Sequence, residues 1–196
     1  MSAARSHLTV SSHLGLTMTA EEYLALGETR ERTELLNGIV ISMSPSPIPR
    51  HWKIVEEILG QLRDFRRAGG TADVYADTDL MIRDLAVLRP DICVYARHAP
   101  DNIPERLTET PDLIVEVLSP GSEAYDLVTK KNEYEQRGVH EYWVIDPATV
   151  ALRVWNRKGD RFVELVPHAS SVPSTTLAGF ALDRTALARA VGLPRA

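Results

Sequence analysis

The amino-acid sequence predicts an α/β fold, and three neighbouring segments carry this prediction. Residues 113–118 form a short apolar run broken only by Glu116 and bounded by proline and glycine, which is typical of a strand buried on both faces. Ser122 and Gly138 suit the start and the end of a helix of about four turns. Residues 142–145 form a second apolar run. Together the segments predict a βαβ unit whose helix begins where the first strand ends.

The N-terminal part is expected to hold a tail, a helix and a hairpin. Residues 1–15 are polar and small and predict a flexible tail, whereas 16–196 are expected to form one domain. Thr19 and Glu22 form a capping box for a short helix, for which packing at the domain edge is the simplest role. Asn37-Gly38 separates two apolar runs and predicts a hairpin of strands 34–36 and 39–43.

Two polar residues in this part could belong to a site. Glu34 lies in the first strand of the hairpin, so it either faces a site or is a solvated strand residue. His51 begins a helix whose apolar residues recur at helical spacing until about Arg67. A lone histidine is more often a surface or hydrogen-bonding residue than a ligand, so both readings of His51 stay open.

The remaining segments read as strands and one closing helix. Strands are expected at 72–76, 80–82 and 92–95, and Asp91 precedes the last of these. A polar loop covers 97–110. Beyond the βαβ unit, a second hairpin is expected at 152–156 and 162–166, and Asp183 caps a helix that closes the chain.

Composition bounds the class of protein. The 196 residues are 44% hydrophobic with a formal net charge of −5, which argues mildly against a broad basic surface for nucleic acid. Cys93 is the single cysteine, so no intrachain disulfide is possible. We see no signal peptide or membrane span, so a soluble cytoplasmic protein is expected.

Asp91, Glu116 and Lys130 are the strongest candidates for chemistry. Asp91 and Glu116 lie on neighbouring predicted strands, and Asp126, Lys130 and Tyr134 recur every four residues along one face of the helix. Two carboxylates suit Mg²⁺ or Mn²⁺, which keep several waters, and a nearby amine can stabilise the charge of phosphodiester hydrolysis. The same three side chains could also be a structural ion pair, and His51 with two carboxylates leaves zinc open.

The segments RPDICVY, PDLIVEVLSPGSEAYD and KKNEYEQRGVHEYWVIDP resemble the Uma-two family of restriction endonucleases, a branch of the PD-(D/E)XK nuclease superfamily. With MTAEEYLAL and the RTELLNGIVISMSPSP hairpin, the resemblance covers about residues 18–147 in order. It implies a restriction-endonuclease-like α/β core, with a central mixed sheet flanked by helices, and divalent-metal hydrolysis of DNA.

Carried over by position, the resemblance places the superfamily aspartate on Asp91 and its second acidic residue on Glu116. Leu118 stands where the superfamily has lysine, and the family lysine falls on the following helix at Lys130, with Lys131 the less favoured neighbour. Glu34, His51 and Asp126 are supporting members of the implied site.

The sequence therefore predicts a cytoplasmic, Mg²⁺-dependent (or Mn²⁺-dependent) DNA endonuclease with Asp91 and Glu116 as metal ligands and Lys130 as the catalytic amine. A homodimer could place one site on each strand of a DNA duplex. Two alternatives stay open: a non-catalytic module of the same fold that binds nucleic acid or a partner, and a hydrolase of small phosphoesters.

Overall fold

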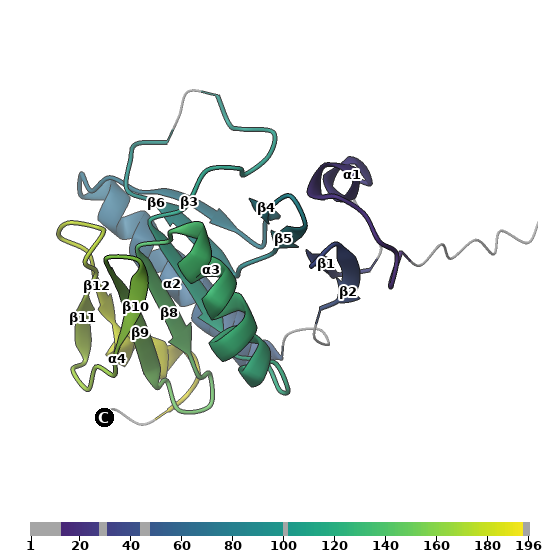
Figure 1. The fold of residues 1–196 in the computed structure, drawn as a ribbon. Coiled ribbons are helices and arrows are strands. Elements are labelled where there is room, and N and C mark those ends of the chain that lie inside the picture. Colours follow the sequence, from purple (N-terminus) through teal and green to yellow (C-terminus); the bar gives the residue numbers. More distant parts are fainter. Residues whose placement is uncertain (1–12, 28–30, 44–47, 100–101, 194–196) are drawn as a thin grey trace, which may run out of the picture.

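The computed structural model describes residues 13–27, 31–43, 48–99 and 102–193 (Figure 1). The helices are α1 (Ala20–Ala25), α2 (Pro49–Arg67), the π-helix η1 (Tyr125–Lys130), α3 (Lys131–Arg137) and α4 (Arg184–Ala190). The strands are β1 (Thr33–Leu36), β2 (Ile39–Ser42), β3 (Asp73–Ala76), β4 (Leu80–Arg83), β5 (Ala86–Leu88), β6 (Ile92–Tyr95), β7 (Leu113–Val117), β8 (Glu141–Ile145), β9 (Leu152–Lys158), β10 (Arg161–Leu165), β11 (Ser171–Pro173) and β12 (Ala181–Asp183).

A mixed sheet of six strands, in the order β10-β9-β8-β7-β6-β3, forms the centre of the fold. Only β7 and β8 pair in parallel, and η1 with α3 connects them across one face. The other neighbours in this sheet are antiparallel. The predicted βαβ unit and the central mixed sheet flanked by helices are both confirmed.

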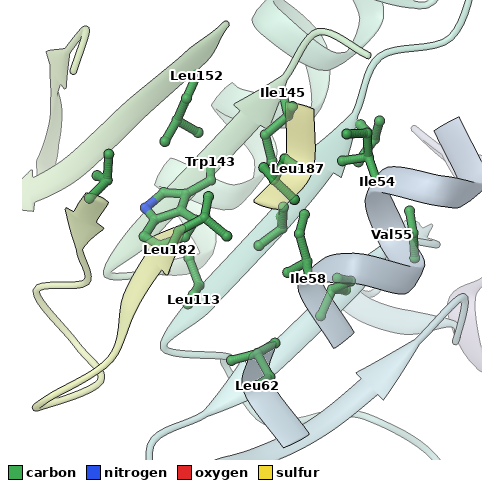
Figure 2. Packing of buried hydrophobic residues seen from close by; sticks show 14 of the residues in the cluster. Ile54, Val55, Ile58, Leu62, Leu113, Trp143, Ile145, Leu152, Leu182 and Leu187 are labelled. Carbon is green, nitrogen blue, oxygen red and sulfur yellow. The ribbon is translucent and has the colours of Figure 1, made fainter. Parts of the chain in front are cut away.

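Strand alternation gives the central sheet one core on each face, and a third apolar cluster joins α1 to the N-terminal hairpin. Ile92 and Val94 of β6 belong to the cluster that packs against α2 and α4. Figure 2 shows Ile54 of α2, Trp143 of β8 and Leu187 of α4 in this cluster. Cys93 of β6 points to the opposite face, which is covered by α3 and by β4 and β5. Because both faces are covered, a polar side chain in a central strand is buried whichever way it points.

The N-terminal hairpin belongs to a second sheet, in the order β2-β1-β5-β4. Asn37 and Gly38 have φ angles of 52° and 75°, and two consecutive positive values are what a two-residue hairpin turn of type I′ requires. The capping box of Thr19 and Glu22 is present at α1, as predicted. Gly15 also reaches this hairpin, because its N–H donates to the carbonyl of Val40 at 2.8 Å.

Three short strands and one cap differ from the sequence-based expectations. β5, β11 and β12 were not predicted, because three residues are too few to show a strand pattern. Ser122 does not cap a helix through its side chain: its hydroxyl accepts from the N–H of Ser119 and donates to Asp126. The cap at Asp183 is confirmed, since its carboxylate accepts from two N–H groups of α4. The sequence also predicts a stiff connection at Pro45, Pro47 and Pro49, of which residues 45–47 lie outside the described residues.

Candidate active site

Glu116 lies in β7 with its side chain on the face of the sheet that η1 and α3 cover. Its neighbours Val115 and Val117 pack on the opposite face, against α2. The residue is 3% exposed, and its Oε1 accepts hydrogen bonds from Lys130 Nζ at 2.9 Å and from the Tyr134 hydroxyl at 2.8 Å. The carboxylate that interrupts an apolar strand is therefore paired, as burial of a charge requires.

Asp91 lies just before β6, which pairs antiparallel with β7 and so brings it beside Glu116. Its Oδ2 accepts from the N–H of Val117 at 2.7 Å, and its own N–H lies 3.4 Å from Glu116 Oε2. The same Oδ2 lies 3.1 Å from Nε2 of His51. These contacts hold the two carboxylates next to each other at the end of the sheet.

Lys130 connects three carboxylates. Its Nζ lies 2.9 Å from Glu116, 3.3 Å from Glu34 and 3.8 Å from Asp126, and the residue is 3% exposed. The helical spacing of Asp126, Lys130 and Tyr134 predicted that they share one face, and all three are buried. The helix thus brings the Lys130 amine to Glu116 of β7. The residue two positions after Glu116, Leu118, carries no amine.

The segment that carries Lys130 is a π-helix rather than the expected α-helix. The N–H of Lys131 reaches the carbonyl of Asp126, five residues earlier. The same carbonyl accepts from the buried Tyr142 hydroxyl at 3.0 Å, and the Asp126 carboxylate accepts from Ser122 at 2.6 Å. The side chains of Tyr142 and Ser122 therefore hold the π-helix in place one turn before Lys130.

Glu34 belongs to the site, so the alternative of a solvated strand residue is wrong. The residue is 1% exposed. Its Oε1 accepts from the N–H of Arg89 at 2.8 Å, and its Oε2 accepts from the Tyr125 hydroxyl at 2.7 Å. The hairpin of the second sheet therefore supplies a third carboxylate to the Lys130 cluster.

His51 is a buried hydrogen-bonding residue rather than a surface one. It is 4% exposed, and its pairing with Asp91 places the first turn of α2 against the end of β6. Its Nδ1 is also buried and has no hydrogen-bond partner among the described residues. His51 thus orients one carboxylate of the site.

These residues surround a cleft of about 50 Å³, large enough for a few water molecules. Its walls come from the β1–β2 hairpin, the start of α2, the ends of β6 and β7, and η1, and they include all six candidates, Glu34, His51, Asp91, Glu116, Asp126 and Lys130. Lys131 is not among them. Its Nζ lies 6.0 Å from the Phe162 ring, so the neighbouring lysine points elsewhere.

Burial and the neighbouring charges shift the pKa values of Glu116 and Lys130. Burial raises the pKa of Glu116 well above its ordinary value, and Asp91 raises it further, whereas Lys130 lowers it. Burial alone would lower the pKa of Lys130, but Glu116 and Glu34 outweigh it, so this pKa lies well above the ordinary value. Lys130 is therefore an ammonium ion at neutral pH.

A comparison with protein-family models matches residues 20–186 to Uma2, described as "Putative restriction endonuclease". The match spans most of the chain. The chain belongs to the Uma2 family. A comparison with curated proteins found no match.

A solved structure supports the fold of this Uma2-family chain. The crystal structure of "a putative nuclease belonging to DUF820" from Anabaena variabilis superposes with a TM-score of 0.74, at 21% identity, over 89% of this chain and 99% of the other. At that identity the similarity establishes the shared fold. Within the described ranges, no helix of the Uma2-family chain is long and apolar enough to cross a bilayer.

The donor set fits a hard divalent ion that keeps several waters. In the described part of the chain, no three His, Cys, Asp or Glu side chains are arranged to hold a metal ion. Asp91 and Glu116 nevertheless have oxygens in reserve, because the short hydrogen bonds fall on Oδ2 and Oε1 respectively. Mg²⁺ needs only one or two protein carboxylates. This Uma2-family site therefore suits Mg²⁺ or Mn²⁺ better than zinc, which prefers nitrogen and sulfur.

Sequence reasoning missed two tyrosines that hold these carboxylates. Tyr125 donates to Glu34 and Tyr134 donates to Glu116. Tyr134 shares the helical face of Asp126 and Lys130, and that spacing was the one available signal. Nothing in the sequence marks Tyr125, because its partner lies 91 residues earlier.

Proposed function

We propose that this Uma2-family protein is a divalent-metal-dependent endonuclease that hydrolyses DNA phosphodiester bonds. The observation that carries the proposal is the meeting of Asp91, Glu116 and the Lys130 ammonium group at one cleft. Family membership supports the nuclease class. The choice of DNA follows what the family resemblance implies, whereas the choice of Mg²⁺ or Mn²⁺ and the individual residue roles are our inference from the chemistry of these side chains.

Asp91 and Glu116 would hold the metal ion, because each carboxylate keeps one oxygen outside the short hydrogen bonds. Bound there, Mg²⁺ or Mn²⁺ would polarise a phosphoryl oxygen and lower the pKa of a bound water. The protein keeps both carboxylates in place by hydrogen bonds from Val117 N–H, His51 and Tyr134. Such supporting bonds orient ligands and adjust their basicity.

Lys130 would act as a cation and not as a base, because three carboxylates keep its amine protonated. A fixed ammonium group can stabilise the negative charge that develops on the phosphate, or orient the attacking water. Asp126 and Glu34 also contact the ammonium group, at 3.8 Å and 3.3 Å. In this proposal both are positioning residues.

We also propose a homodimer that acts in the cytoplasm, since two clefts related by a two-fold axis would address the two strands of a duplex. Light scattering with size-exclusion chromatography tests the dimer. A monomer at all working concentrations contradicts it without affecting the proposed chemistry.

Cleavage of supercoiled plasmid by the purified protein, with Mg²⁺, Mn²⁺ or EDTA, tests the activity. We expect metal-dependent nicking that Asp91→Ala, Glu116→Ala and Lys130→Ala abolish, whereas Lys131→Ala, the matched control, retains it. Intact plasmid with both metals, despite measurable DNA binding, would support the non-catalytic module instead. Hydrolysis of small phosphoesters without any cleavage of duplex DNA would support the alternative of a small-phosphoester hydrolase.

A further inference from the structure

A second and larger cavity adjoins the active-site cleft. It has a volume of about 510 Å³, within the range of small-molecule sites. Its apolar wall comes from α1 and from the segment after β6, with Leu24, Tyr75 and Ile103 among its side chains. Ile103 is 81% exposed, an unusual position for a large apolar side chain. A cavity of this volume is large enough for a single heterocyclic ring.

Two contacts join this cavity to the catalytic carboxylates. The N–H of Asp77, which lines the cavity, donates to the carbonyl of Asp91 at 3.1 Å. Arg89 lines both the cavity and the cleft, and its N–H donates to Glu34. The cavity and the cleft are therefore neighbours, with Arg89 as a wall residue that both share.

The polar wall of the cavity offers a donor and an acceptor side by side. Arg89 Nε donates to Asp79 Oδ1 at 2.8 Å, and both side chains are about one quarter exposed. This bond leaves Oδ2 of Asp79 able to accept and the terminal N–H groups of Arg89 able to donate. An adjacent donor and acceptor are the pattern that the hydrogen-bonding edge of a nucleobase complements.

We propose that this cavity, bounded by Leu24, Tyr75, Asp79, Arg89 and Ile103, binds a nucleobase of the DNA strand whose phosphate lies at the cleft. The inference rests on the proposed nuclease function, because it takes the neighbouring ligand to be DNA. Taking a base out of a duplex costs the energy of its stacking and pairing, and this cost is least where the base is mismatched or already unpaired. The cavity would thus favour single-stranded or distorted DNA and contribute to target choice.

Nuclear magnetic resonance titration without metal tests this inference separately from catalysis. The four deoxynucleosides are added in turn to the ¹⁵N-labelled protein at millimolar concentrations. We expect at least one to shift the amide signals of Thr78, Asp79 and Arg89. Leu24→Trp, which fills the cavity, should weaken that binding by about tenfold or more. Leu165→Trp, the same change at an exposed leucine of β10, should leave it unchanged.

Further variants and probes decide the outcome. Asp79→Asn keeps the shape of the wall and removes the charged acceptor, so it should weaken binding even if Leu24→Trp fails to fold. Inorganic phosphate that reproduces the same shifts would make the cavity an anion site and overturn the proposal. So would the absence of shifts with all four nucleosides in a protein that still nicks plasmid, an outcome that leaves the nuclease function standing. Nucleoside binding by a protein that never cleaves DNA would contradict only the nuclease function.

DNA that carries 2-aminopurine provides an independent readout. The fluorescence of this base rises when it leaves the stack, so wild-type protein in EDTA should raise the signal of a duplex with a mismatch. The rise should vanish with Leu24→Trp and persist with Leu165→Trp. An equal rise with both variants would show that the base is not held in this cavity.

Discussion

The Lys130 ammonium group lies 2.9 Å from Glu116 Oε1, although the lysine comes from a helix and the glutamate from a strand. Both side chains are at least 96% buried. The contact brings a cation from the π-helix to the carboxylate of β7, which is followed by Leu118 at the end of the strand. It also makes the site a structural element whose loss should affect folding.

Replacing Lys130 by methionine should lower the free energy of unfolding by about 3–5 kcal/mol, because it leaves buried carboxylates without their cation. Urea denaturation followed by circular dichroism measures this change. Lys131→Met, at the adjacent and half-buried position, should stay within about 0.5 kcal/mol of wild type. If Lys130→Met costs less than about 1 kcal/mol, the cluster does not hold the fold together.

Replacing Tyr134 by phenylalanine should weaken both metal binding and cleavage by about 10–100-fold, the usual effect of losing a group that orients a ligand. The hydroxyl that is lost donates to Glu116 in a buried site, so stability should also fall by about 1.5–3 kcal/mol. Mn²⁺ titration and plasmid nicking measure the two functional effects. Tyr95→Phe is the control, because its hydroxyl donates to the carbonyl of Glu109, outside the site. Equal behaviour of the two variants would remove Tyr134 from the positioning role.

Local signals allowed much of the fold to be predicted, and distant contacts account for what was missed. Asn37-Gly38 specifies its turn by itself, and Asp183 specifies a helix start, since each acts on residues next to it. Asp91 and Glu116 could be placed together because their strands are close in sequence. The burial of Glu34 depends on Tyr125 and Arg89, whose distance along the chain leaves no local signal.

The activity should fall as the pH is lowered. The fall should begin at a higher pH than the one at which an ordinary glutamate side chain becomes protonated. Burial raises the pKa of Glu116 from its ordinary value of 4.5, and metal binding requires the ionised carboxylate. The affinity for Mn²⁺ is therefore full above the raised pKa and is lost as protonation of Glu116 sets in below it. Calorimetric titration across a pH series measures this dependence. A Mn²⁺ affinity that stays constant down to about pH 5 would show that Glu116 is not a titrating ligand.

Glu141 should stabilise the C-terminal segment without contributing to catalysis. It is fully buried, and its carboxylate accepts hydrogen bonds from Trp143, Ser174, Thr175 and Thr176, which tie the segment between β11 and β12 to the start of β8. Glutamine would turn an amide N–H₂ toward these donors, so Glu141→Gln should lower the free energy of unfolding by about 3 kcal/mol.

The matched control for this change is Glu164→Gln on the exposed strand β10, where a surface ion pair with Arg153 contributes about 0–1 kcal/mol. Glu141 pairs with Leu113 at the start of β7, whereas Glu116 pairs with Val144 further along. Nicking by Glu141→Gln, measured well below its melting temperature, should therefore match wild type per folded molecule. A loss of nicking in a fully folded variant would mean that the anchored segment reaches the DNA, which would extend the functional surface along β8.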